Sequence, residues 1–351
     1  MFEFVPGVHL ERRAHNQKTA RALAEKYGET VGVSGVLKHL NRKARSMPVP
    51  GRGPVEGFTW NVQDNVSPDW WPQGITTSAD ADPAGTYDGH RLVVVSWYSH
   101  GSSARNEGSR ISFIDLDTLE YRHVLVVRAD KDGFKPLEIH AGGIVWVGPW
   151  LHLAGTARGI YTCHVDDIVK VEPSDDTYDY RYVLPVRFTY AARNDEKTER
   201  LRYSFLSLDR GTDPPQLVAG EYGVKGQTTR LIRYPLDPET LELHRDEEGL
   251  ARPIYLDEGV GHMQGAAVVG DEYYITVSKG RFRLGALVVG KPDDLRPRRW
   301  ALPPGPEDIS YWPQTDQFWS LCEYPRRRFV FAMDRARLRR FPTLRTLGPR
   351  R

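Results

Sequence analysis

Gln73-Gly74-Ile75-Thr76 decides the fold, because its pattern of a polar residue, a small residue and an apolar strand returns along the chain. The pattern returns as Gly142-Gly143-Ile144-Val145 behind His140 and as Gln264-Gly265-Ala266-Ala267 behind His262. An altered copy reads Glu307-Asp308-Ile309-Ser310. Self-similarity at such spacings is the signature of a repeat architecture.

Short apolar strands follow each copy and fix a repeat of roughly 40 to 65 residues. The second strand of each repeat makes the register visible, and these strands cover residues 92–98, 151–157, 216–222, 272–278 and 317–323. A third strand follows each of them after a turn and runs toward an acidic turn in most repeats. A fourth strand is expected at residues 121–125, 180–184 and 299–302.

Four antiparallel strands per unit are typical of a β-propeller blade. The sequence therefore predicts an all-β fold, a single β-propeller of five four-stranded blades over residues 57–345. The third blade should begin near residues 202–208, and residues 58–62 should supply the missing strand of the last blade and close the ring. A two-sheet sandwich with long insertions is the competing architecture, and the fixed four-strand period argues against it.

Residues 1–56 are predicted to form a basic, helical N-terminal extension that ends in a Pro/Gly linker, and residues 346–351 a basic tail. Apolar residues recur at near-helical spacing from Leu10 to Tyr27, and a second short helix is expected over residues 36–45. A basic arm for nucleic acid or a membrane surface is one interpretation. Helices docked on a larger domain also keep a charged outer face, and we prefer that interpretation.

The composition limits the partners. A formal net charge of +2 over 351 residues provides no overall field that would recruit nucleic acid or an anionic membrane. Cys163 and Cys322 lie in apolar strand patterns and are predicted to be buried thiols rather than a disulfide framework or a zinc site. No run is long enough to span a bilayer, and residues 1–7 lack a signal-peptide pattern, so we expect a cytoplasmic monomer.

Several catalytic motifs are missing from the sequence. It contains no phosphate loop of the Walker type, no strand-linked G-x-G-x-x-G, no H-E-x-x-H helix and no G-x-S-x-G elbow. The acidic stretch at residues 80–88 lacks the ligand order of an EF-hand, and a surface loop is the preferred interpretation.

The best candidate site is the mouth of the central channel, because first strands of propeller blades line the channel and several blades can present side chains there. The repeated phrase places a polar column at this mouth, namely Gln73, Gly142, Tyr203, Gln264 and Glu307. An alternative needs no ligand: glycine permits close approach of backbones near a narrow axis, and glutamines can bond neighbouring backbone groups.

Two histidines and two carboxylates form the sharper constellation. His140 and His262 hold equivalent positions in the second and fourth blades, and Glu307 and Asp308 belong to the fifth. Imidazole and carboxylate groups in a confined mouth can act as general acid and base. A divalent metal ion there is possible but not favoured, because the ligands are scattered along the chain.

Aromatic residues end the second strands of three blades. Tyr98, Tyr222 and Tyr324 hold these positions, each preceded by Trp97, Glu221 or Glu323. Packing between blades is the simpler explanation, and a platform on which sugar rings stack is the alternative.

Several phrases in matching order resemble a group of mostly secreted, uncharacterised actinobacterial proteins that look like propellers, and they lie at residues 71–76, 80–82, 94–98, 121–125, 140–143, 263–265 and 306–312. The resemblance spans about residues 58 to 335 and implies a propeller fold without implying an activity. A basic helical segment replaces the signal peptide of that group, and the abundance of arginine, proline and glycine fits an actinobacterial origin.

The leading hypothesis is an enzyme of specialised or carbohydrate metabolism, of the hydrolase, lyase or cyclase type, acting on a small polar substrate. His140, His262, Glu307 and Asp308 would carry the acid-base chemistry, and Gln73, Gln264, Tyr203 and Tyr222 would bind the substrate. The alternatives are a non-catalytic propeller that binds a glycan or metabolite, and a scaffold whose N-terminal helices dock a partner.

Overall fold

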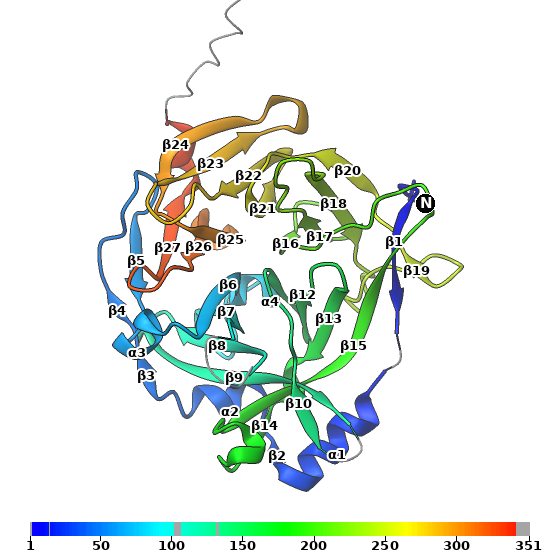
Figure 1. The fold of residues 1–351 in the computed structure, drawn as a ribbon, viewed down its shortest axis with the longest axis vertical. Coiled ribbons are helices and arrows are strands. Elements are labelled where there is room, and N and C mark those ends of the chain that lie inside the picture. The colour runs from blue at the N-terminus through cyan, green and yellow to red at the C-terminus, as the bar shows by residue number, and fades with distance from the viewer. Residues whose placement is uncertain (1, 14, 102–106, 131–132, 342–351) are drawn as a thin grey trace, which may run out of the picture.

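The computed structural model describes residues 2–13, 15–101, 107–130 and 133–341. Within them the chain forms an all-β propeller whose short antiparallel strands surround a central axis (Figure 1). The basic tail expected at residues 346–351, and the last residues of the predicted propeller range, lie outside the described part of the chain.

The strands group into five antiparallel units of four. Unit 1 contains β6 (Trp70–Thr77), β7 (Leu92–Ser99), β8 (Ser109–Asp115) and β9 (Glu120–Ala129). Unit 2 contains β11 (Ile144–Val147), β12 (Trp150–Ala154), β13 (Gly159–His164) and β15 (Tyr182–Asn194). Unit 3 contains β16 (Phe205–Asp209), β17 (Gln216–Gly220), β18 (Arg230–Pro235) and β20 (Tyr255–Glu258).

Unit 4 contains β21 (Met263–Val269), β22 (Glu272–Val277), β23 (Gly285–Gly290) and β24 (Arg296–Leu302). Unit 5 contains β25 (Pro306–Trp312), β26 (Gln317–Cys322), β27 (Phe329–Asp334) and, from the other end of the propeller, β5 (Glu56–Thr59). The expected closing strand therefore forms, with Phe58 opposite Val330. It ends at Thr59 rather than residue 62, because Asn61 caps helix α3 (Val62–Val66) and accepts a hydrogen bond from the backbone N–H of Asp64 at 2.9 Å.

The first strand of each unit lies next to the axis. β6, β11, β16, β21 and β25 contact one another in this order, and β25 contacts β6 again, so the innermost strands form a closed ring (Figure 1). Apolar clusters fill the space between neighbouring units, for example Ala267, Tyr274, Ile309 and Phe318 between units 4 and 5. Each unit is thus stabilised by burying its faces against its neighbours.

Glycine is required where the innermost strands approach one another. A Cβ atom added to Gly143 would lie 2.1 Å from the backbone nitrogen of Leu206, and one added to Gly265 would lie 2.7 Å from Cα of Asp308. At Gly74 the added atom would lie 2.7 Å from the backbone nitrogen of Ile144. The glycine of the repeated phrase is therefore explained by crowding at the axis.

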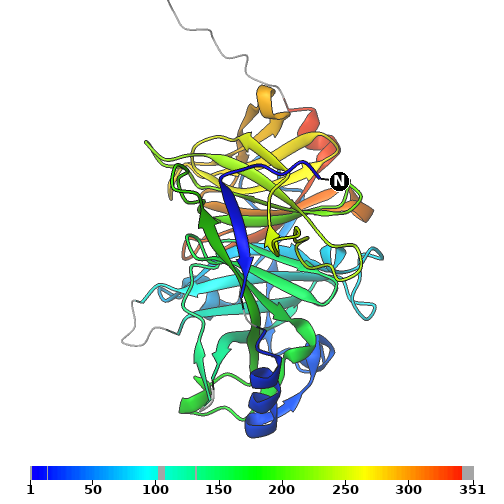
Figure 2. The ribbon, with the colours of Figure 1, turned by 90° about the vertical axis from the view of Figure 1, so that its right-hand side faces the viewer.

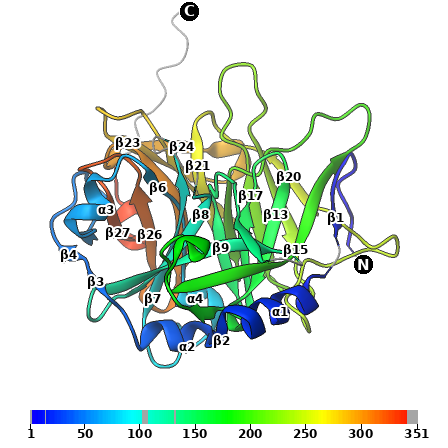
Figure 3. The same cartoon turned by 60° about the horizontal axis from the view of Figure 1, so that its bottom comes forward.

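The N-terminal residues pack against the propeller through paired strands as well as helices. β1 (Val8–Arg12) pairs with β15, placing Val8 opposite Asn194, and runs alongside it in the side view (Figure 2). Helix α1 (Gln17–Tyr27) buries Leu23 and Ala24 in one cluster with Val127 and Val183. Helices α1 and α2 (Gly32–Leu37) lie along one side of the ring (Figure 3). The preference for docked helices over a free basic arm fits this packing.

Two expectations for this segment were wrong. Residues 8–12 form a strand instead of part of a helix. Buried Val8 and Leu10 alternate with more exposed residues, which is the two-residue period of a strand. The second helix covers Gly32–Leu37 instead of residues 36–45. Residues beyond it form β3 (Arg42–Lys43), paired with β9, and β4 (Arg45–Ser46), paired with β5.

Units 1 and 2 share one sheet through a parallel contact between β9 and β15, in which Leu125 faces Val183. The remaining short elements are α4 (Ser78–Ala81), α5 (Arg335–Arg339), β2 (Gly28–Thr30), β10 (Phe134–Pro136), β14 (Val169–Val171) and β19 (Leu250–Ala251), with 3-10 turns at Val165–Asp167, Asp175–Thr177, Pro292–Asp294 and Pro313–Thr315. The prediction of buried free thiols at Cys163 and Cys322 is confirmed. Over the described residues, none of the helices has the length and apolar character needed to cross a membrane.

Candidate functional site at the axis

Side chains from the first and second strands of several units meet at one face of the ring. The innermost strands begin there, and the second strands, which run antiparallel to them, end there. Gln73, Gln264 and Glu307 come from the beginnings of β6, β21 and β25. Tyr98 comes from the end of β7, and Tyr222 and Glu323 follow the ends of β17 and β26. We call these six residues the mouth cluster.

A β-bulge lies at each of the three innermost-strand members of the cluster. The pairing register shifts between Pro72 and Ile75 in β6, between Met263 and Gly265 in β21, and between Pro306 and Ile309 in β25. The bulged residues are therefore Gln73, Gln264 and Glu307 with their neighbours. Because a bulge redirects a side chain out of the regular alternation, it aims these polar groups away from the packed faces of the units.

Each glutamine of the cluster holds one carboxylate. Gln264 Nε2 donates to Glu307 Oε1 at 2.8 Å, and Gln73 Nε2 donates to Glu323 Oε2 at 3.2 Å. Gln73 also donates to the carbonyl oxygen of Pro72 at 3.0 Å. Gln73 and Gln264 were predicted to bind substrate. In the structure their side-chain amides hydrogen-bond the two glutamates and position them.

The two carboxylates have unequal surroundings. Glu307 is 2% exposed, and burial, followed by the charges of Glu323 and Asp308, raises its pKa well above the usual range. Burial also raises the pKa of Glu323, but hydrogen bonds from Gln73 and Tyr324 and the charges of Arg328 and His100 oppose that rise. Of the two groups, Glu307 therefore holds its proton more strongly, and Glu323 is the better-stabilised anion.

The tyrosines and histidines lie around this pair. Tyr98 stacks on His140 with ring centroids 4.4 Å apart, and the Tyr222 hydroxyl lies 3.0 Å from His262 Nδ1. Burial, with the negative charges of Glu323 and Glu307, raises the pKa of Tyr98 to about 12. The same causes raise the pKa of Tyr222. Both hydroxyls therefore stay protonated and can donate hydrogen bonds beside the carboxylates.

The predicted histidines contact tyrosines rather than glutamates in the structure. Both residues are exposed, but stacking on Tyr98 removes part of the His140 ring from water, and this desolvation, followed by the charge of His100, lowers the pKa of His140. His262 adopts a φ of 65°, a backbone conformation that few non-glycine residues take. These placements put His140 and His262 on the rim of the cluster.

Asp308 and Tyr203 lie apart from the cluster. Asp308 is fully buried, and its Oδ2 accepts hydrogen bonds from the backbone N–H groups of Ile75 and Ile144 at 3.3 and 3.4 Å. It thereby joins β25 to β6 and β11 at the axis. Tyr203 is 1% exposed, and its hydroxyl lies 2.7 Å from that of Tyr234 inside the core.

Aromatic rings border the cluster near Glu323. Trp71 stacks on His100 with centroids 5.0 Å apart and meets Tyr324 edge-on at 5.9 Å. Tyr324 also hydrogen-bonds Glu323. Trp71 and Tyr324 are each half-buried, so part of their surface stays open beside the carboxylates. Such rings suit stacking against the apolar face of a sugar.

The reasoning from sequence missed Glu323 and the bulges. Glu323 stands in the alternation of acidic and aromatic residues at second-strand ends, which could have identified it. A search of the described residues finds no group of three or more histidine, cysteine, aspartate or glutamate side chains placed to hold a metal ion.

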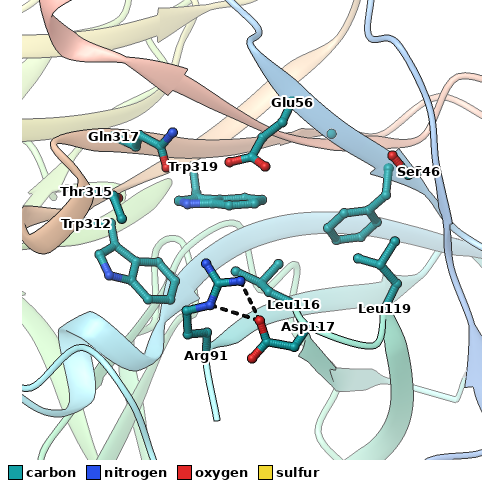
Figure 4. A pocket seen from close by; sticks show the side chains of 12 residues that line it. Ser46, Glu56, Arg91, Leu116, Asp117, Leu119, Trp312, Thr315, Gln317 and Trp319 are labelled. Carbon is teal, nitrogen blue, oxygen red and sulfur yellow. Dashed lines mark hydrogen bonds and ion pairs between the residues drawn. The ribbon is translucent and has the colours of Figure 1, made fainter.

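Two cavities lie on the outer part of the ring. One of about 240 Å³ lies at the seam between units 5 and 1 and is bordered by Trp312, Trp319, Arg91 and Glu56. Figure 4 shows Arg91, bonded to Asp117, and Glu56 on either side of the Trp319 ring. A larger apolar groove of about 630 Å³ lies on unit 4 beside Trp300. The carboxyl groups that border the seam cavity, those of Glu56 and Asp117, are exposed, unlike that of Glu307 in the mouth cluster.

Comparisons with known proteins give no family. No family model matches the chain, and no curated protein matches it. Among solved structures, the gluconolactonase XC5397 from Xanthomonas campestris is 13% identical over 95% of this chain and 88% of that chain, with a TM-score of 0.38. The RS223 beta-xylosidase is 11% identical over 76% and 92%, with a TM-score of 0.38. A GH43_1 enzyme from Xanthomonas citri is 11% identical over 85% and 92%, with a TM-score of 0.37. At TM-scores this low, these likenesses carry no argument about activity.

Proposed function

We propose that the chain is a hydrolase that uses Glu307 and Glu323 as an acid-base pair on a small polar substrate, with the five four-stranded units serving as blades of one ring. The observation that supports this most directly is the inequality of the two carboxyl groups. Neighbouring carboxyls whose surroundings push their pKa values apart can divide the roles of acid and base.

Glu307 serves as the general acid. Its proton is held by burial and by the nearby negative charge of Glu323, and Gln264 fixes one of its oxygens. In the first step Glu307 gives this proton to the leaving oxygen of the substrate as the bond to that oxygen breaks.

Glu323 serves as the base or the nucleophile. Gln73, Tyr324 and Arg328 stabilise its anion, and the carboxylate can take a proton from an attacking water. The protonated hydroxyls of Tyr98 and Tyr222 donate to negative charge that develops on the substrate. His140 and His262 hold these tyrosines in place.

A sugar-like substrate fits the border of the cluster. The open surface of Trp71 and Tyr324 beside two carboxyl groups provides a stacking face next to polar groups that bind hydroxyls. A non-catalytic glycan-binding role would use the same face, and it differs from the enzyme in needing no protonated carboxyl.

The test is a comparison of Glu307→Gln and Glu323→Gln with the parent chain on a panel of nitrophenyl glycosides and sugar lactones. Each variant keeps the shape of the side chain and loses the proton transfer, so turnover should fall by about 10²- to 10⁴-fold. Glu56→Gln, an exposed carboxylate at the seam, is the matched control and should keep full turnover.

Two outcomes would overturn the proposal. One is turnover by the parent chain that neither glutamate variant reduces. The other is saturable binding of a panel glycoside that no condition converts to product, which would support the glycan-binding role instead.

A further inference from the structure

A polar cavity of about 290 Å³ lies on the outer side of unit 1, apart from the mouth cluster. Its wall is formed by β3, the beginning of β8, the beginning of β9 and the loop before β15. These segments bring together four guanidinium groups, those of Arg42, Arg110, Arg122 and Arg181, and we call the cavity the arginine pocket. Two acidic residues, Glu107 and Asp179, also line it.

The positive charge in the arginine pocket is only partly neutralised. Arg110 is paired with Asp64 at 2.9 Å, while Arg42 lies 3.8 Å from the same carboxylate. Arg181 lies 3.8 Å from Glu172, which is 85% exposed and gives weak compensation. In the described part of the chain no carboxylate lies within ion-pair distance of Arg122.

Arg122 is held close to other cations. Its Nη1 donates to the carbonyl oxygen of His39 at 2.7 Å, and its guanidinium lies over the ring of Tyr182 at 5.0 Å. Burial, followed by the charges of Arg181 and Arg42, lowers its pKa. Holding the like charges of Arg122, Arg181 and Arg42 near one another costs free energy. An anion bound between them would recover part of that cost.

Arg110 supplies the buried wall of the pocket. The residue is 5% exposed, and its guanidinium lies 4.3 Å from the ring centroid of Trp70 and 4.8 Å from that of Trp97. Its Nε is buried and, within the described residues, has no hydrogen-bond partner. Packing against the two tryptophans and the ion pair with Asp64 therefore hold Arg110 as a fixed positive wall of the pocket.

We propose that the arginine pocket binds a phosphate group, with Arg122 and Arg181 as its principal ligands and Arg42 and Arg110 completing the positive wall. Guanidinium groups match the oxygens of phosphate in pairs, and Arg122 has no carboxylate partner among the described residues to compete with such an anion. The phosphate group belongs either to free phosphate or to a small organic phosphate.

Isothermal titration calorimetry with inorganic phosphate and, separately, with glycerol 3-phosphate tests the proposal on the full chain at low ionic strength. Saturable binding at one site is expected. Arg181→Gln should weaken it about tenfold, because a hydrogen bond to a charged group is lost, and Arg122→Gln/Arg181→Gln should remove it from the measurable range. Tighter binding of glycerol 3-phosphate would identify an organic phosphate as the source, and equal affinities would identify free phosphate.

The matched control is Arg128→Gln/Arg158→Gln, which removes the same charge from two exposed arginines beside another polar cavity and should leave binding unchanged. Arg181→Gln keeps the test valid if the double variant fails to fold, because the contact of Arg181 with Glu172 is long and exposed. Absence of saturable binding by either probe would overturn the proposal. So would an affinity that is unchanged in the Arg181 variant, or one that falls equally in the control. Glu307→Gln should bind phosphate normally, so this result does not depend on the proposed hydrolase activity.

Discussion

Asp64 and Glu307 are both almost completely buried, at 5% and 2% exposure, but they meet opposite surroundings. Asp64 accepts hydrogen bonds from Arg110, Tyr121 and His123 at 2.9, 2.6 and 3.0 Å. Glu307 accepts a hydrogen bond from the neutral amide of Gln264 and faces the negative charge of Glu323. Within the described residues no cation lies at ion-pair distance from Glu307.

The protonation states follow from these surroundings. Burial alone would raise the pKa of Asp64, but His123 and Arg110 outweigh it and hold that pKa far below its usual range. Burial raises the pKa of Glu307, and nothing comparable opposes it. Burial therefore does not mark a functional carboxyl by itself. A buried carboxyl that the fold leaves without a cation and sets beside a second glutamate is the better indicator.

The Asp64 region also shows how a catalytic arrangement can be imitated. His123 Nδ1 lies 2.8 Å from Ser112 Oγ, while its Nε2 lies 3.0 Å from Asp64, which is the order of a serine-histidine-aspartate relay. Ser112 is fully buried, and its hydroxyl accepts a hydrogen bond from Trp97 Nε1 at 2.8 Å. No substrate can reach it, so this network stabilises unit 1.

The largest expected effect on stability is that of Asp64→Asn. The variant leaves buried Arg110 without its counter-charge and should lower the free energy of unfolding by about 3–5 kcal/mol. Urea unfolding at pH 7 measures this loss. Asp117→Asn, at an exposed ion pair with Arg91, is the control and should change stability by less than about 1 kcal/mol. Equal effects of the two substitutions would break the distinction between the Asp64 network and a surface pair.

Acid should weaken the Asp64 region through His123. Burial and then Arg110 lower the pKa of His123 to about 4, so the folded state favours the neutral ring. Its contribution to stability is present above the unfolded value of about 6.5 and is lost as the pH falls toward 4, by about 3 kcal/mol in total. Urea midpoints at pH 7 and pH 4 should therefore differ less in His123→Gln than in the parent chain. An unchanged difference would show that His123 is not held neutral.

A rise in pH should destabilise the fold through Glu307. This pH dependence is opposite in sign to that of His123. Because the folded pKa of Glu307 is raised, its contribution to stability is complete below about pH 4.3 and falls as the pH rises through the folded value. Glu307→Gln removes this loss and should be more stable than the parent chain at pH 8. The advantage should disappear near pH 4. A variant less stable at pH 8 would contradict the protonated state of Glu307.

The smallest effect should come from the rim of the cluster. Tyr222→Phe removes the hydrogen bond between its hydroxyl and exposed His262 and should cost no more than about 1 kcal/mol in thermal unfolding. It should also reduce turnover less than Glu307→Gln does, because the hydroxyl assists the carboxyl pair without carrying its proton. A loss of turnover equal to that of Glu307→Gln would move Tyr222 into the centre of the mechanism.

Much of the propeller could be predicted from the sequence, because its strands are local apolar runs separated by turns. The glycines of the repeated phrase could be explained as well, since Gly143 and Gly265 occupy equivalent crowded positions. Strand β1 could not be predicted, because its pairing with β15 depends on a partner about 180 residues away in the sequence. The five residues of β1, Val8 to Arg12, are too few for their pattern to distinguish a short strand from a short helix.

The candidate site was harder to predict than the fold. The positions of Gln73, Gln264 and Glu307 near the axis followed from the repeat, but their aim depends on bulges that leave no periodic signal. Asp308 is adjacent to Glu307 in sequence, yet its carboxylate faces backbone N–H groups of neighbouring strands. Only the packing of units 1, 2 and 5 separates these two roles.

Carboxyl-carbon NMR titration of Glu307 and Glu323 tests the central claim most directly, because it needs no substrate. Selective ¹³C labelling of glutamate, with Glu307→Gln and Glu323→Gln to assign the two signals, would follow each group through the pH range in which the chain stays folded. We predict that Glu307 remains protonated at pH 7 and that Glu323 ionises at lower pH than Glu307. Two carboxyls that both ionise near the ordinary glutamate value of about 4.3 would contradict the account.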